Sequence, residues 1–267
     1  MNAFKQMLST QPRPLGTWLM SASPIVTEAM GCAGFAWGVV DMEHTPLDMM
    51  SVVHMLQAAA GTPLVPVVRV PWNDTVGIKR VLDAGAQTLL VPFVQNADEA
   101  RAAVAATRYP PQGVRGIAAM GRASRFGTMT DFYAASNRDN GVIVQLETPQ
   151  AIAQLEAIAA VPGVDALFLG PGDLSGALGQ IGNTGHPDVL AAMQDAVHRA
   201  RAVGTPIGTV GGTVEMVERY LEMGCDFVAL SSDLGLLMRA ATAGITALKA
   251  HIDQDTRRAA PTIQGSY

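Results

Sequence analysis

The stretch GVVDMEHTP, at residues 38–46, ends an apolar run on three ionisable side chains, those of Asp41, Glu43 and His44. A carboxylate that pairs with an imidazole fixes the histidine tautomer and raises its basicity, which suits proton transfer near neutral pH. Asp41 and His44 are therefore candidates for an acid/base dyad. The alternative is a surface histidine beside the start of a helix.

Arg69 and Gln145 end other apolar runs, PVVR and VIVQ, while Glu147 and Asp173 follow in VQLET and GPGDLSG. An arginine in such a run is either a structural ion-pair member or an electrophile aimed at an oxygen that gains negative charge. Carboxylates at the ends of neighbouring parallel strands, about 4.8 Å apart, can converge on a divalent cation such as Mg²⁺ or Mn²⁺. Otherwise Glu147 caps the next helix and Asp173 only forms a turn.

The glycines of GPGDLSG, Gly170 and Gly172, permit close approach of a ligand. The backbone amides of Gly172 and Asp173 can hold a carboxylate beside a metal, although Gly-Pro-Gly is also an ordinary turn. The three lysines of the chain all lie away from the predicted strand ends. A Schiff-base mechanism therefore has no nucleophile.

These residues need a scaffold that gathers strand ends, and short apolar runs that alternate with amphipathic helical patterns predict one. Eight such runs in 267 residues most simply close into a (β/α)8 TIM barrel, whose active site lies at the carboxyl ends of the strands. An open doubly wound sheet is the alternative, but no run opens into a GxGxxG turn. The predicted strands are 14–20, 35–43, 63–70, 88–94, 141–147, 165–171, 206–211 and 227–233.

The composition indicates a cytoplasmic protein that acts on a small molecule. A net charge of -5 without a basic stripe argues against nucleic acid and membrane surfaces as partners. No apolar run reaches the roughly 18 residues of a spanning helix, and the N-terminus lacks a leader-like segment. Cys32 and Cys225 are predicted to be reduced, buried thiols. One barrel domain is expected over 1–253, with a polar tail at 254–267.

The segment 109–140 is too long for an ordinary helix-to-strand connection and carries four arginines. It is either an ordered surface for subunit contact or an arm that brings Arg122 or Arg125 to an active site. That site belongs to the same subunit or to a neighbouring one.

The motifs DMEH, VVRVP, LLVPFV, RYPPQGVRG, VQLET and LGPGDLS, in this order across nearly the whole chain, resemble the 4-hydroxy-2-oxoheptanedioate aldolase (HpcH/HpaI) family of metal-dependent pyruvate aldolases. The resemblance implies a (β/α)8 barrel in a homo-hexamer, a trimer of dimers whose eighth helix is exchanged between partners. It also implies that Asp83 and Arg122 lie near a subunit boundary.

By match of motif, the metal ligands are Glu147 and Asp173, with Gln145 beside them. The resemblance further implies that Arg69 contacts the pyruvate carbonyl and that Asp41 with His44 forms the acid/base dyad. Glu43 has no assigned role and is expected to be structural or to lie behind the site.

The remaining matches concern the substrate. Trp18 and Val210 are implied to line the aldehyde side. Gly172 stands where relatives carry an alanine, and it is implied to leave slightly more room beside the pyruvate.

The expected reaction is the reversible cleavage of a 4-hydroxy-2-oxo acid to an aldehyde and pyruvate, or a related 2-oxo acid such as hydroxypyruvate. A divalent cation, Mg²⁺, Mn²⁺ or Co²⁺, acidifies the methyl group and stabilises the enolate. The substrate is either a hydroxy-oxo diacid or a deoxy-keto sugar acid. The alternatives are an acyl-CoA ester lyase on a related barrel and a non-catalytic barrel that binds sugar acids.

Overall fold

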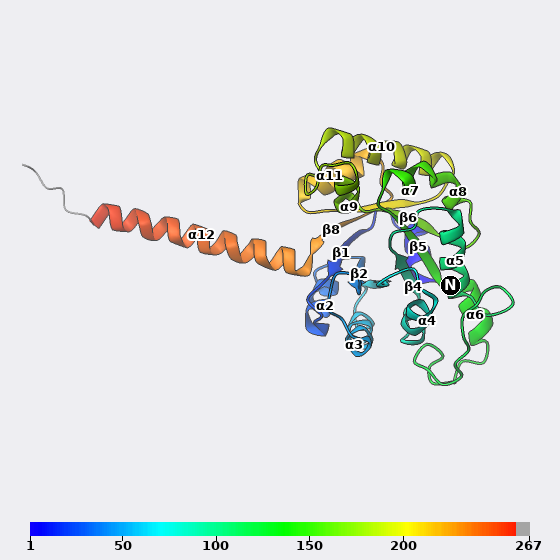
Figure 1. Ribbon diagram of the computed structural model, residues 1–267. Helices are drawn as coiled ribbons and strands as arrows, with labels where there is room; N and C mark the ends of the chain where they lie inside the picture. Colours follow the sequence, from blue (N-terminus) through cyan, green and yellow to red (C-terminus); the bar gives the residue numbers. More distant parts are fainter. Residues whose placement is uncertain (260–267) are drawn as a thin grey trace, which may run out of the picture.

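Eight parallel strands close into one barrel in the computed structural model, which describes residues 1–259 (Figure 1). Each strand pairs with its neighbours in chain order, and β1 closes the barrel on β8. The predicted TIM barrel is confirmed, and every strand lies within its predicted range. The strands are β1 (Leu15–Leu19), β2 (Trp37–Asp41), β3 (Val65–Arg69), β4 (Thr88–Val91), β5 (Gly141–Leu146), β6 (Ala166–Leu169), β7 (Ile207–Gly211) and β8 (Phe227–Ser232).

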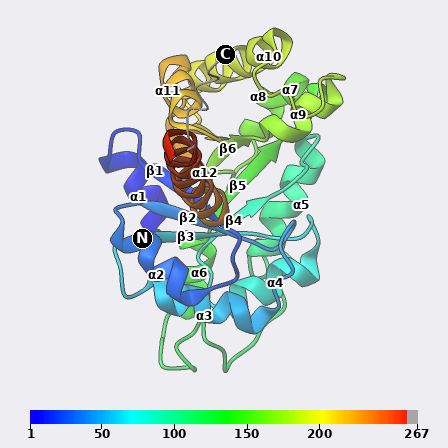
Figure 2. The ribbon, with the colours of Figure 1, turned by 90° about the vertical axis from the view of Figure 1, so that its left-hand side faces the viewer.

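Helices alternate with the strands and surround the barrel (Figure 2). The helical segment after β5 is interrupted at Gln154, whose φ of -100° and ψ of 10° leave the helical region. The helices are α1 (Ala3–Thr10), α2 (Pro24–Cys32), α3 (Met49–Ala59), α4 (Thr75–Asp83), α5 (Ala97–Thr107), α6 (Phe132–Asp139), α7 (Pro149–Ala153), α8 (Leu155–Ala159), α9 (Pro171–Ala177), α10 (Pro187–Ala202), α11 (Val214–Met223) and α12 (Asp233–Ala259).

The strands divide their side chains between two hydrophobic layers. Successive side chains of a strand point to opposite faces, so alternate residues fill the barrel and the others pack beneath the helices. In β2, Trp37 and Val39 belong to the interior cluster, whereas Val40 belongs to the outer one. This alternation decides which residues beyond the apolar part of each strand also face inward.

Helix α1 closes the amino-terminal end of the barrel. Its buried Phe4 makes edge-to-face contacts with Trp37 and Phe227, at ring-centroid distances of 6.0 and 5.4 Å. Asn2 caps the helix and donates from its side-chain amide to the backbone carbonyl of Gln87. The barrel interior is therefore a packed aromatic core, and the opposite, carboxyl end is left for a site.

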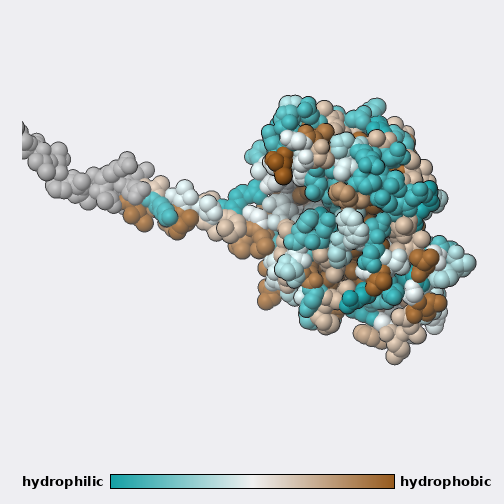
Figure 3. Space-filling model, viewed as in Figure 1, coloured by the Kyte–Doolittle hydropathy of each residue, from teal (hydrophilic) through white to brown (hydrophobic). Residues whose placement is uncertain are grey.

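Helix α12 leaves the barrel after the eighth strand instead of packing along it (Figure 1). It continues to Ala259, beyond the expected start of the tail at 254, and residues 260–267 lie outside the described residues. Apolar side chains gather along its exposed surface (Figure 3), among them Leu237, Met238, Ile245 and Leu248. Over residues 1–259, no helix is both long enough and apolar enough to cross a membrane.

The two cysteines are free thiols in different environments. Cys225 is buried, and burial raises the pKa of its thiol to about 12. The prediction was wrong for Cys32, which is exposed because it ends α2 on the side away from the core.

We expect Phe4→Ala to lower the free energy of unfolding by about 3–5 kcal/mol, because it leaves a cavity among aromatic rings that cannot collapse. Chemical denaturation of the variant and the parent measures the change. Ile181→Ala is the matched control, since Ile181 is 89% exposed and its loss should change stability by less than about 0.5 kcal/mol. Equal effects of the two substitutions would contradict the closing role of α1.

Candidate functional site

The strand alternation carries several polar side chains into the barrel at its carboxyl end. Asp41 lies two residues after the interior Val39, and Arg69 lies two residues after the interior Val67. Gln145 follows Ile143 in the same way. Trp18 belongs to the interior cluster and Val210 packs against it, and each lies one residue before the carboxyl end of its strand. Both predicted substrate-side residues therefore lie at this end of the barrel.

Asp41 and Arg69 form a buried, bidentate ion pair. They are Cα partners on neighbouring strands, and the Arg69 Nε and Nη2 atoms donate to the two carboxylate oxygens at 2.8 and 2.6 Å. Burial disfavours the guanidinium charge, but hydrogen bonds and charge from Asp41 outweigh it, so the pKa of Arg69 lies above its usual value. The guanidinium carbon lies 5.5 Å from the centroid of the Trp18 ring. A fixed positive charge therefore faces the site.

The carboxylate nearest to the His44 imidazole is Glu43, at 3.8 Å from Nε2. Glu43 also pairs with Nη1 of Arg69 at 3.0 Å. Burial raises the pKa of Glu43, and the positive charge of Arg69 opposes this shift. Glu43, which the sequence left without a role, thus lies between the arginine and the histidine.

The predicted pair of Asp41 and His44 side chains is not formed. Both oxygens of Asp41 are held by Arg69, and Asp41 otherwise accepts from the backbone N–H groups of Glu43 and His44. The carboxylate therefore shapes the turn that presents His44, whose side chain is 57% exposed.

Glu147 is a buried carboxylate held by two hydrogen bonds. Its oxygens accept from the backbone N–H of Phe93 and from Nε2 of Gln145, both at 2.8 Å. Thr148, not Glu147, caps the next helix. Burial raises the pKa of Glu147 to about 8, and the negative charges of Asp173 and Glu43 add to this shift although the Phe93 N–H opposes it.

The loop after β6 adds Asp173 in the first turn of α9. A Cβ atom at Gly170 would lie 2.7 Å from Cγ and Oε1 of Glu147, so only glycine leaves room for that side chain. At Gly172 a Cβ would meet nothing within 4 Å. The first glycine therefore makes space for a ligand residue, and the second leaves open space beside it.

The donor set fits a hard divalent cation that also takes ligands from substrate or water. Among residues 1–259, no three or more His, Cys, Asp and Glu side chains form a complete metal cage. Glu147 and Asp173 are, however, two carboxylates close enough to raise the pKa of Glu147, and a cation between them would remove that repulsion. Oε1 of Gln145 is buried without a partner beside them. Mg²⁺ commonly uses one or two carboxylates and completes its octahedron with water and substrate.

Two aromatic residues at this rim had no sequence signal as site residues. The Phe93 N–H contacts Glu147, and the Phe93 ring stacks on Trp72 with centroids 5.9 Å apart. Phe93 has a φ of 55°, in the left-handed region that favours glycine. The motif LLVPFV predicted only a strand, because an aromatic residue gives no indication of a left-handed turn.

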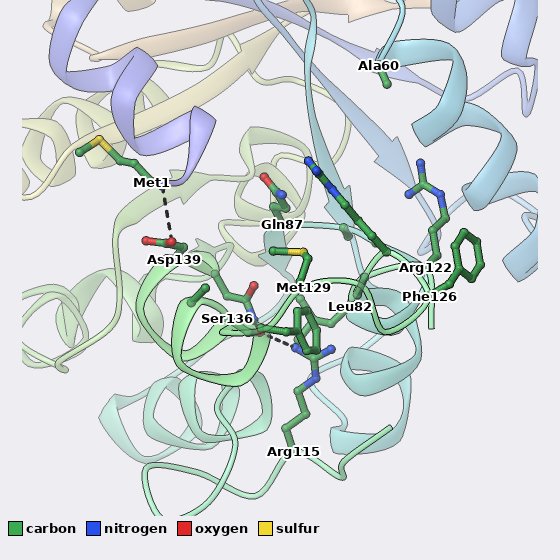
Figure 4. Close-up of a pocket in the computed structure, with 17 residues that line it drawn as sticks. Met1, Ala60, Leu82, Gln87, Arg115, Arg122, Phe126, Met129, Ser136 and Asp139 are labelled. Carbon is green, nitrogen blue, oxygen red and sulfur yellow. Dashed lines mark hydrogen bonds and ion pairs between the residues drawn. The ribbon is translucent and has the colours of Figure 1, made fainter. Parts of the chain in front are cut away.

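Asp83 and Arg122 lie at the other end of the barrel from the carboxylates. Asp83 ends α4 and pairs with Arg115 at 2.6 Å, while Nη1 of Arg122 donates to the carbonyl of Ala84. Arg122 lines a cavity of about 590 Å³ that also borders Gln87, ahead of β4 (Figure 4). Because they lie at the opposite end of the barrel from Glu147 and Asp173, these two residues do not join the site of their own chain.

The chain resembles known proteins over nearly its whole length. The HpcH/HpaI aldolase/citrate lyase family matches residues 15–240. The chain is 54% identical over 243 residues to the 2-dehydro-3,6-dideoxy-6-sulfogluconate aldolase of Pseudomonas putida, covering 91% of this chain and 95% of the relative. It is 47% identical over 234 residues to the 5-keto-4-deoxy-D-glucarate aldolase of Salmonella newport (strain SL254), covering 88% of this chain and 91% of the relative.

Among solved structures, an HpcH/HpaI aldolase/citrate lyase family protein from Burkholderia cenocepacia J2315 is 39% identical, with a TM-score of 0.90. The alignment covers 93% of this chain and 100% of that protein. The relatives described above are named as aldolases, which are lyases. The chain therefore belongs to the HpcH/HpaI aldolase/citrate lyase family, which confirms the family and the enzyme class that the motifs implied.

Proposed function

We propose that this protein is a divalent-metal-dependent aldolase that reversibly cleaves a 4-hydroxy-2-oxo acid to a pyruvate-type 2-oxo acid and an aldehyde. The observation that carries the proposal is the pair of carboxylates, Glu147 and Asp173, at the same barrel end as the fixed guanidinium of Arg69. A substrate at this end meets both a cation site and a positive side chain.

Glu147 and Asp173 would hold the cation, which is Mg²⁺, Mn²⁺ or Co²⁺. When bound, it supplies Lewis-acid polarisation of the 2-oxo acid. The N-terminal amides of α9, at Gly172 and Asp173, would bind the substrate carboxylate next to it.

Arg69 stabilises the charge that develops on the C2 oxygen. When the C3–C4 bond breaks, its electron pair moves toward C3 and this oxygen, and C4 leaves as the aldehyde. The ion pair with Asp41 fixes the guanidinium before the reaction, so little reorganisation is needed when the charge appears.

His44 carries the proton. In cleavage it accepts the proton of the C4 hydroxyl and later releases it to solvent, while the enolate carbon C3 takes up a proton from solvent to give the 2-oxo acid. In the addition direction His44 donates a proton to the new alkoxide. The carboxylate of Glu43, 3.8 Å from Nε2 of His44, stabilises the imidazolium that forms when His44 accepts the proton. The exposure of His44 supports this role, because its side chain can reach a substrate that enters the site from solvent.

The substrate we propose is a deoxy-keto sugar acid. The two relatives described above are named for a dideoxy-sulfogluconate and a deoxy-glucarate, which favours this class over a diacid from aromatic degradation. Trp18 and Val210 would line the aldehyde side, and the open space at Gly172 would admit a larger donor such as hydroxypyruvate.

We further propose that the cytoplasmic protein works as a homo-hexamer in which α12 packs on a partner subunit. The exposed apolar side chains of α12, such as Leu237 and Leu248, support this assembly, as do Ile117 and Phe126 on the segment 109–140. In such an assembly Asp83 and Arg122 would contribute to a neighbour's site.

Retro-aldol activity should disappear on full chelation with EDTA and return when Mg²⁺, Mn²⁺ or Co²⁺ is added, because the cation supplies the polarisation that the side chains lack. A panel of 4-hydroxy-2-oxo acids, with sugar-acid and diacid members, identifies the substrate. Glu147→Gln is the matched variant and should not recover on metal addition. Activity that survives chelation would contradict the proposal. Turnover of a CoA ester alone would show that the protein is the alternative, an acyl-CoA ester lyase.

His44→Ala should lower kcat by about 10²–10⁴-fold, because the proton acceptor is lost. The affinity for Mn²⁺, measured by calorimetry, should stay within about twofold of that of the parent. The reason is that Glu147 and Asp173, and not His44, would hold the cation. His54→Ala is the control, because His54 is exposed on α3 and should leave kcat unchanged. If Glu43→Gln matched the parent in kcat and in pH profile, the pairing of Glu43 with His44 would have no role in proton transfer.

The pKa of about 8 at Glu147 predicts that the affinity for Mn²⁺ increases with pH. A proton competes with the cation below pH 8, so the affinity for Mn²⁺ should rise by up to tenfold per pH unit below pH 8 and level off above it.

The stability of the metal-free protein should instead fall as the pH rises. Its folded state binds the Glu147 proton more tightly than the unfolded state does, so this contribution to stability is lost as the pH rises from about 4.5 to 8. Calorimetric titrations and denaturation from pH 5 to 9 measure both slopes.

A further inference from the structure

Two aromatic rings stack on the rim of the barrel beside the carboxylates. Trp72 follows β3 and Phe93 follows β4, and their rings lie 5.9 Å apart with an angle of 26° between their planes. Trp72 is 55% exposed and Phe93 is 38% exposed. Neither ring is therefore buried in the core, and the two rings pack against each other at the surface.

The backbone of Phe93 has a conformation that is unusual for its residue type. Its φ of 55° is in the left-handed region, which is costly for a residue with a β-carbon and ordinary for glycine. Such strain persists only where the surroundings hold it, and it is frequent at functional sites.

This conformation connects the rim to the proposed cation site. The Phe93 N–H donates to Oε2 of Glu147 at 2.8 Å, and the next N–H, that of Val94, donates to the carbonyl of Gln145 at 3.1 Å. Two successive N–H groups of the loop after β4 thereby bond to Gln145 in β5 and to Glu147 directly after it. Because Oε1 of Glu147 is held by Gln145, the Phe93 N–H is the contact that fixes the second oxygen.

We propose that the Trp72–Phe93 stack is a positioning device for Glu147: it keeps the backbone of Phe93 in its left-handed conformation, so that the Phe93 N–H orients the carboxylate that receives the cation. The inference rests on the proposed metal-dependent function. It assigns Trp72 an effect on metal affinity that acts through Phe93. Partners that orient metal ligands commonly change metal affinity by one to two orders of magnitude when they are removed.

The test measures Mn²⁺ binding to the metal-free, full-length protein by calorimetry, together with hydrogen exchange of the Phe93 amide. Trp72→Ala should weaken Mn²⁺ binding by about two- to tenfold and speed exchange of the Phe93 amide. Trp72→Tyr keeps a stacking ring and should bind Mn²⁺ within about twofold of the parent. Phe93→Ala should weaken binding more than Phe93→Gly, because glycine reaches the left-handed region without strain.

Val203→Ala is the control. Val203 is also an exposed apolar residue, 47% exposed, but it follows α10 and is not part of the proposed site or the proposed subunit contact. Its substitution should leave Mn²⁺ binding unchanged. Parent-like binding and exchange in Trp72→Ala would overturn the inference, as would equal losses in Phe93→Ala and Phe93→Gly.

The result also separates this inference from the proposed function. If the parent binds Mn²⁺ and Glu147→Gln does not, the cation site stands, and the stack variants alone decide the inference. If the parent and Glu147→Gln bind Mn²⁺ equally, the proposed cation site fails, and the inference fails with it.

Discussion

The closed parallel barrel imposes a two-residue alternation on every strand, and the site depends on it. A residue that continues the inward row past the apolar core must face the carboxyl end of the barrel, whatever its chemistry. This constraint brings Asp41, Arg69 and Gln145 to the same place from three strands. A shift of one residue in any strand would turn its polar side chain into the layer beneath the helices.

The second determinant is the balance of charge. Asp41, Glu43 and Glu147 lie near one guanidinium, that of Arg69, and Asp173 lies near Glu43 and Glu147. The guanidinium is already used by Asp41 and Glu43, so the negative charge that remains lies on the side of Glu147. A buried carboxylate without a counter-charge takes up a proton more readily, and a cation relieves the same imbalance. The electrostatics of the apoprotein therefore already favour a cation at this position.

The eight strands were predictable because each is a short apolar run between helical patterns, and the inward residues at the strand ends follow from counting by two. The contacts around His44 were not predictable. Asp41 and Glu43 are equally plausible partners by spacing, and only the register between β2 and β3, which gives Asp41 to Arg69, decides between them. The left-handed turn at Phe93 was also hidden, because its residue type argues against it. The departure of α12 from the barrel could not be read from its amphipathic pattern, since the pattern does not say which molecule covers its apolar side.

The helix that closes the amino-terminal end has a consequence for how the chain is made. Asn2 is 1% exposed and bonds to Gln87 and Thr88, and Lys5 pairs with Asp165 at 2.8 Å. Helix α1 must therefore wait for partners that are synthesised much later, and such distant contacts form slowly. Until Asp165 emerges, the aromatic face of Phe4 has no barrel to enter. Helix α1 is thus among the last parts of the barrel to reach its place, although it precedes all eight strands in the sequence.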